Sequence, residues 1–241
     1  MRDSAAILKE YSLICQKVGL SPDKVIATAT EAARVAKNAK QFFKDIKNDT
    51  GLNISIITGE AEAYYSTIGI LIDSNIDERE VCIMDIGGAS TELIKVNTSE
   101  KRIIDSISMP VGAVRMNNWS VEGSCHIKLN EIFDNYKSRL EVFKAKTLYC
   151  VAGTMTSVGN IHLGNKTFVE DSVNGLRFSM SEFKTLKETH ENYTPGQYLS
   201  DYPFLGKRSN TINSGIRLAN EVLGYLEVEN VYISTYGLRY G

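Results

Sequence analysis

One short segment, residues 81–92 (VCIMDIGGASTE), constrains the fold more than any other part of the chain. Its first four residues are apolar, as in a buried strand, and the carboxylate of Asp85 follows them. Two glycines and an alanine (residues 87–89) then contribute almost no side chain, and residues 93–96 resume the apolar pattern. The segment therefore predicts a β-hairpin with a tight glycine turn and a carboxylate at its tip.

Such a turn can bind an anion, because glycine lets the backbone approach a ligand and successive amide groups form a concave site. Ser90 or Thr91 adds a hydroxyl donor. Asp85 and Glu92 would repel a phosphate unless a cation lay between them, so the pattern suggests a phosphate bound through a divalent metal ion. The alternative interpretation is a plain hairpin whose glycines only form the turn.

The charge and the rare residues of the chain exclude several classes of function. A net charge of −2 gives no global basic field, so we expect no nucleic-acid partner. The four cysteines contain no C-x-x-C pair and the three histidines are scattered, which argues against disulfides and zinc. No apolar run approaches transmembrane length and the N-terminus lacks a signal-peptide core, so we expect a cytoplasmic protein without a membrane partner.

The first part of the chain predicts parallel α/β structure. Gly19 is suited to end the first helix, and Thr30 is suited to cap the second. Strand–helix–strand order implies a right-handed parallel crossover. The expected elements are helix 4–18, strand 25–29, one long helix over 31–46 and strand 53–57.

Two carboxylates, Glu60 and Glu62, follow the second of these strands at the predicted start of a helix. Ligands bind at that edge of an open α/β sheet, beyond the carboxyl ends of the strands. For Glu60 the simpler interpretation is a favourable interaction with the helix macrodipole. For Glu62 a functional role is favoured by a family resemblance.

The polar residues 73–80 predict a domain boundary, with domains at 1–78 and 79–241. The second domain has the order of a ribonuclease H-like sheet, in which three antiparallel strands precede parallel ones separated by helices. Small residues at 153–157 suggest a second turn, which would meet the turn at 87–91 at one end of the sheet. The expected strands are 81–84, 93–96, 101–108, 147–152 and 231–234.

Six blocks occur in order along the chain, at residues 29–38 (ATEAARVAKN), 56–63 (IITGEAEA), 83–93 (IMDIGGASTEL), 110–116 (PVGAVRM), 151–158 (VAGTMTSV) and 233–241 (ISTYGLRYG). Together they resemble the exopolyphosphatase and guanosine pentaphosphate phosphohydrolase (Ppx/GppA) family, within the actin-like/sugar-kinase superfamily. Six ordered blocks are a more specific signal than one glycine motif.

The resemblance implies an α/β fold of two ribonuclease H-like (actin-like ATPase) domains with a cleft between them. The family opens with another hairpin and three strands that this sequence does not contain, so we expect one complete domain and one N-terminally truncated domain. The parallel sheet of the first domain would then have an open edge, which favours self-association as a homodimer.

The resemblance also implies an activity and its residues. Family members use magnesium (Mg2+) to remove terminal phosphate from polyphosphate or from guanosine penta- and tetraphosphate. Glu62 matches the residue that activates the attacking water. Asp85 and Glu92 match acidic residues near the metal. The implied substrate-binding residues are Arg34, Gly87, Gly88, Ala89, Ser90, Arg115, Gly153 and Thr154.

The sequence leaves open the effect of one substitution, and it also allows two other functions. Ala89 stands where the family usually has glycine, and its methyl group would be crowded if that position needed a positive φ. A catalytically impaired polyphosphate- or nucleotide-binding sensor would keep the phosphate turn without turnover. An ATP-using enzyme of the same superfamily is the third hypothesis, and the order of the blocks and residues 59–63 argue against it.

Overall fold

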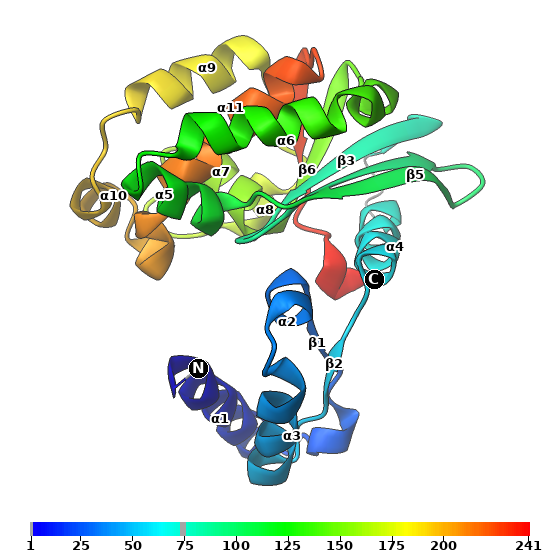
Figure 1. Ribbon diagram of the computed structural model, residues 1–241, viewed down its shortest axis with the longest axis vertical. Coiled ribbons are helices and arrows are strands. Elements are labelled where there is room, and N and C mark those ends of the chain that lie inside the picture. The colour runs from blue at the N-terminus through cyan, green and yellow to red at the C-terminus, as the bar shows by residue number, and fades with distance from the viewer. Residues whose placement is uncertain (1, 73–75) are drawn as a thin grey trace. The chain divides into compact units, whose positions relative to one another are not determined.

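The computed structural model describes residues 2–72 and 76–241 (Figure 1). It contains two compact units, Met1–Glu62 (unit 1) and Ala63–Gly241 (unit 2). Residues 73–75 of the predicted boundary lie outside the described residues. The domain limits 1–78 and 79–241, the truncation of the first domain and the cleft stay predictions.

Unit 1 is built around two parallel strands joined by helices. The register runs from Ala27↔Ile54 to Ala29↔Ile56, which confirms the parallel crossover. The first helix ends before Gly19, whose φ of 70° is the left-handed value that favours glycine. The elements are α1 (Arg2–Lys17), η1 (Pro22–Lys24), β1 (Ala27–Ala29), α2 (Glu31–Val35), α3 (Ala39–Thr50), β2 (Ile54–Ile56) and the start of α4 (Gly59–Leu71).

The prediction of one long helix over 31–46 is wrong. The segment forms the short α2 and then α3, because Ala36 is extended (φ −76°, ψ 115°) and interrupts the helix. Thr30 makes no side-chain capping hydrogen bond. The break separates Arg34, in the last turn of α2, from the lysine-rich α3.

Unit 2 contains a six-stranded sheet in the order β5-β4-β3-β6-β8-β7. The strands β3, β4 and β5 are antiparallel neighbours, and β6 and β8 continue the sheet in parallel, as predicted for a ribonuclease H-like domain. The bounds are β3 (Glu80–Ile86), β4 (Thr91–Asn97), β5 (Arg102–Met109), β6 (Thr147–Val151), β7 (Arg177–Ser179) and β8 (Asn230–Ile233).

Helices cover both faces of this sheet (Figure 1). Met84 and Ile86 join the large core with residues of the helices on one face, whereas Ile83 and Val81 join a smaller core with Ala63 and Ile70 of α4. The alternation follows from the two-residue period of a strand. The helices of unit 2 are α5 (Ala113–Val121), α6 (Cys125–Leu140), η2 (Glu141–Phe143), α7 (Ala152–His162), α8 (Glu170–Val173), α9 (Met180–Thr189), α10 (Pro195–Asp201), η3 (Pro203–Asn210), α11 (Ile212–Tyr225) and η4 (Leu238–Tyr240).

One further prediction differs from the structure. Residues 153–157 do not form a turn, because α7 already begins at Ala152. Residues 195–201 form α10, which begins with a capping box between Thr194 and Gln197 and has Pro195 in its first turn.

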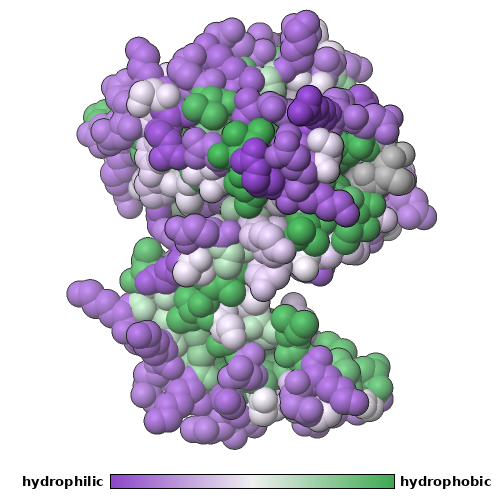
Figure 2. All heavy atoms as spheres, turned by 90° about the vertical axis from the view of Figure 1, so that its right-hand side faces the viewer, coloured by the Kyte–Doolittle hydropathy of each residue, from purple (hydrophilic) through white to green (hydrophobic). Residues whose placement is uncertain are grey.

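Three further features concern membrane-spanning helices, the cysteines and the hydrophobic residues at the surface. No helix in residues 2–72 and 76–241 has the length and apolar character needed to cross a membrane. Cys82, Cys125 and Cys150 are buried, and burial raises the pKa of Cys82 to about 11. Figure 2 shows hydrophobic side chains at the surface of unit 1, where Ile26 is 95% exposed.

The contact of α4 with the C-terminal segment of unit 2 gives a test of this packing. A Cβ at Gly69 would lie 2.3 Å from the backbone oxygen of Gly237, so Gly69→Ala should destabilise the protein by about 1–3 kcal/mol. Gly224 of α11 has nothing within 4 Å of such a Cβ, so Gly224→Ala should leave stability equal or raise it by up to about 1 kcal/mol. Urea unfolding measures both, and equal effects would contradict this packing of α4.

Candidate active site

The predicted hairpin is formed by β3 and β4. Asp85 is the cross-strand partner of Glu92, and Ile86 is the partner of Thr91. The amide of Gly87 donates to the carbonyl of Ser90 at 3.0 Å and closes the turn. Asp85 and Glu92 therefore stand next to each other on one face of the sheet, directly before and after the glycine turn.

The turn is held by the start of α5. The amide of Ala113 donates to the carbonyl of Gly87 (2.9 Å), and those of Val114 and Arg115 donate to the carbonyl of Gly88 (2.9 and 3.1 Å). The first amides of a helix have no partner inside the helix, and here the turn supplies their acceptors. Gly112 has to be glycine for this contact, because a Cβ there would lie 2.5 Å from the carbonyl carbon of Gly88.

The carbonyl groups and the amide groups of the turn differ in their hydrogen bonding. The carbonyls of Gly87 and Gly88 accept from α5, whereas no carbonyl of residues 2–72 or 76–241 accepts from the amides of Gly88, Ala89 or Ser90. Ala89 is not among the residues with positive φ, so its methyl group causes no backbone strain. Consecutive amides of this kind are suited to bind an anion.

Asp85 and Glu92 are buried, with 8% and 3% of their surface exposed. The hydroxyl of Ser108 on β5 donates to Oε1 of Glu92 at 2.7 Å. Within the described residues no group of three His, Cys, Asp or Glu side chains could hold a metal ion. A pair of carboxylates still fits Mg2+, which usually takes one or two protein carboxylates and completes its shell with water and substrate phosphates.

The start of α7 lies beside the hairpin, because Val151 of β6 pairs with Asp85. This brings Gly153 and Thr154 to the same end of the sheet, as the sequence predicted. Ala152 joins β6 to α7 with a φ of 64°, a conformation that costs a non-glycine residue roughly 1–2 kcal/mol. Backbone strain of this kind is often found at functional sites.

Arg208 is a residue of this region that the sequence analysis did not single out. Its Nη1 donates to the hydroxyl of Ser157 at 2.7 Å. A Cβ at Gly153 would lie 2.4 Å from Nη2, so glycine leaves the space for the guanidinium. Burial of the guanidinium lowers the pKa of Arg208, although the residue as a whole is exposed. A single arginine in an irregular segment carries no periodic signal by which sequence analysis could have found it.

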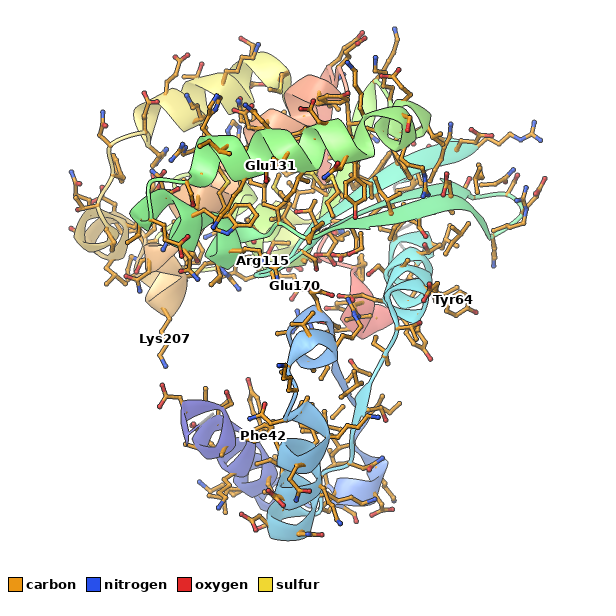
Figure 3. The ribbon with its side chains drawn as sticks, viewed as in Figure 1. Phe42, Tyr64, Arg115, Glu131, Glu170 and Lys207 are labelled. Atoms are coloured by element: carbon orange, nitrogen blue, oxygen red, sulfur yellow. The ribbon has the colours of Figure 1, made fainter. Side chains whose placement is uncertain are left out.

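Arg115 is brought to the hairpin by the backbone of α5 (Figure 3). Its Nη1 donates to the carbonyl of Pro110 at 2.8 Å, which keeps the side chain close to the start of its own helix. The hairpin, the start of α5 and the start of α7 thus gather every predicted site residue of unit 2 in one region.

Unit 1 contains the other two predicted residues, Arg34 and Glu62, and they form an ion pair. Nη1 of Arg34 lies 2.8 Å from Oε2 of Glu62 and also donates to the carbonyl of Ile57 at 3.0 Å. Glu31 is a second partner at 3.3 Å. Burial acts to lower the pKa of Arg34, but its bonds to Glu62 and Glu31 outweigh that effect and the pKa is raised.

Glu60 has different surroundings from Glu62. It is exposed in the first turn of α4, where its own amide and the hydroxyl of Thr58 lower the pKa of its carboxyl group. Thr58 also accepts from the amide of Ala61 at 3.2 Å. The two neighbouring glutamates therefore differ, since Glu62 is 7% exposed and bound by an arginine.

Known proteins resemble this chain in fold. The crystal structure of the Ppx/GppA family member from Aquifex aeolicus matches with a TM-score of 0.74 at 24% identity, covering 99% of this chain and 78% of its own. An exopolyphosphatase from Cytophaga hutchinsonii matches with a TM-score of 0.83 at 20% identity, covering 98% and 78%. These likenesses confirm the predicted actin-like α/β fold.

Curated relatives are similar in sequence over part of their length. The bifunctional 3-dehydroquinate synthase/phosphatase of Fusobacterium nucleatum is 28% identical over 94% of this chain and 35% of its own length. The guanosine-5'-triphosphate,3'-diphosphate pyrophosphatase of Aeromonas salmonicida is 32% identical over 63% of this chain and 30% of its own. The chain thus spans about a third of the length of these relatives.

The model of the Ppx/GppA phosphatase family matches residues 1–241. This match covers both units, including the hairpin and the Arg34–Glu62 pair, and it agrees with the resemblance of the six sequence blocks. The chain belongs to the Ppx/GppA phosphatase family.

Proposed function

We propose that the chain is a phosphoanhydride hydrolase that releases terminal phosphate from inorganic polyphosphate or from guanosine penta- or tetraphosphate by metal-assisted attack of water. The observation that carries the proposal is the buried pair Asp85 and Glu92 beside a glycine turn whose amides at residues 88–90 donate to no backbone carbonyl of residues 2–72 or 76–241. Family membership and the names of the Aeromonas and Cytophaga relatives support this choice of substrates.

The turn would bind the phosphate that is removed. The amides of Gly88, Ala89 and Ser90, next to Gly87, would donate to its oxygens, since consecutive amides form a concave anion site and none of the three donates to a described backbone carbonyl. Arg115, Gly153 and Thr154 would line the same region. Arginine suits phosphate because its guanidinium donates two parallel hydrogen bonds.

Mg2+ would be held by Asp85 and Glu92 and, when bound, would neutralise charge on the phosphates. Ser108 holds Oε1 of Glu92, which fixes the orientation of that carboxylate. In phosphoryl transfer to water the protein contributes mainly positioning and charge stabilisation.

Glu62 would orient the attacking water and accept its proton. Arg34 binds Oε2 of Glu62, so Oε1 is the oxygen that would accept from water. The raised pKa of Arg34 keeps its guanidinium cationic at every physiological pH, so it can also neutralise phosphate charge.

We expect the protein to be cytoplasmic, and we expect the edge of the β1–β2 sheet to favour a homodimer. A two-stranded sheet is marginal on its own and gains stability from a further strand. Both statements stay predictions.

Replacing the water-orienting carboxylate tests the mechanism. Glu62→Gln should lower kcat for phosphate release from polyphosphate by roughly 10²–10⁴-fold, since the amide cannot accept the proton. Glu60→Gln is the matched control and should change kcat by less than about twofold, because its exposed carboxylate only stabilises the helix start. Equal rates of Glu62→Gln and wild type would remove Glu62 from the mechanism.

The same assay separates the other hypotheses when polyphosphate, guanosine pentaphosphate and ATP are compared. Tight binding of polyphosphate without phosphate release by the wild-type chain would establish the sensor instead. Hydrolysis of ATP far faster than of the other two substrates would establish an ATPase. Either result would overturn the proposed hydrolase.

Removing one metal ligand tests the role of the carboxylate pair. Asp85→Asn should raise the Mg2+ concentration for half-maximal phosphate release at least about tenfold. Removing a residue that only supports a metal ligand already lowers metal affinity by about that factor, and Asp85 is proposed to bind the metal directly. Asp134→Asn, which neutralises an exposed carboxylate on α6, serves as the control and should leave this concentration unchanged. A magnesium titration that is identical in all three proteins would exclude Asp85 as a ligand.

A further inference from the structure

A hollow of about 390 Å³ lies between α3 and β2 in unit 1, outside the site described above. Three lysines of α3, Lys40, Lys44 and Lys47, line it together with Phe43 of α3 and Ile54 and Ile56 of β2. The lysines are four and three residues apart, so they follow one another along a single face of the helix. We call this hollow the lysine groove.

The charges of α3 are segregated. Asp45 accepts a hydrogen bond from Gln41 (2.8 Å) and Asp49 pairs with Lys9 of α1 (2.9 Å), so both acidic residues of the helix have partners away from the groove lysines. The groove lysines are exposed and form no ion pair with any residue in 2–72 or 76–241. In a chain of net charge −2, three such lysines in a row are a local attraction for anions.

The direction of the row follows from the topology of unit 1. A crossover helix runs antiparallel to the strands it joins, so Lys47 lies toward the start of β2 and Lys40 toward its end. Directly after β2, the carbonyl of Ile57 accepts from Arg34. The lysine row therefore leads, over roughly 10 Å at 1.5 Å per residue, toward the end of unit 1 that holds Arg34 and Glu62.

We propose that the lysine groove binds linear inorganic polyphosphate, at phosphates several units away from the one that is hydrolysed. The choice of polyphosphate as the anion rests on the proposed function. The row itself has room for only a few phosphates, so a ligand that occupies the row and also reaches the Arg34–Glu62 end has to be a longer chain. A guanosine tetra- or pentaphosphate or tripolyphosphate is too short to occupy both. The groove thus makes the chain prefer long polyphosphate.

The test compares long polyphosphate of about 100 phosphates with tripolyphosphate, measured by calorimetry in a Glu62→Gln background that slows turnover by roughly 10²–10⁴-fold. Lys40→Gln, Lys44→Gln and Lys47→Gln together should weaken binding of the long chain about tenfold, as three exposed ion pairs would. The Kd for tripolyphosphate should change by less than about twofold, and the salt dependence of long-chain binding should become shallower.

The matched control removes the same charge elsewhere. Lys137, Lys166 and Lys184 are exposed on unit 2 and form no ion pair among the described residues, so replacing all three by glutamine should leave the long-chain Kd within about twofold. Thermal unfolding of both triple variants checks that they are folded.

The proposal is overturned if the groove variant binds long polyphosphate as wild type does, or if the control variant weakens it equally. Unchanged polyphosphate binding together with weakened binding of an acidic peptide would assign the groove to a protein partner. Absence of phosphate release by the wild-type chain would overturn the proposed hydrolase alone, because the Kd values do not depend on turnover.

Discussion

The hydrogen bonds from the first amides of α5 to the carbonyls of Gly87 and Gly88 are the interaction on which the candidate site depends. They supply acceptors to the first amides of the helix and donors to two carbonyls of the turn at once. They also fix which way the peptide groups of the turn face. Gly112 permits this close contact, because a side chain at that position would collide with the backbone of the turn.

The electrostatic properties of this protein depend on local groups of charged residues and not on its net charge. The net charge is small, but Arg34 is held between Glu62 and Glu31, Asp85 and Glu92 share one end of a hairpin, and the lysines of α3 stand apart from its acidic residues. Such a local arrangement would let one chain meet opposite requirements, because the proposed metal ion needs carboxylates and the proposed polyanion needs cations.

The strands and the hairpin could be predicted from the sequence because both depend on local patterns, namely short apolar runs and small residues between them. The break between α2 and α3 could not, since residues 36–38 contain neither glycine nor proline and the backbone turns at Ala36 all the same. Residues 153–157 are predicted as a turn but form part of a helix, because small residues suit a turn and a tightly packed helix equally well. Arg208 was missed because only the folded chain brings it to Ser157.

The left-handed conformation of Ala152 limits which residue types can occupy position 152, where β6 joins α7. A β-branched or bulky side chain would add further steric cost to a position that is already strained, so substitution is confined to glycine, asparagine and other residues that tolerate this backbone. Relatives that keep the strand-to-helix connection should therefore vary little here, whereas the exposed residues of α6 are free to change. A library of all substitutions at position 152 would measure that restriction directly, as the fraction of variants that still fold.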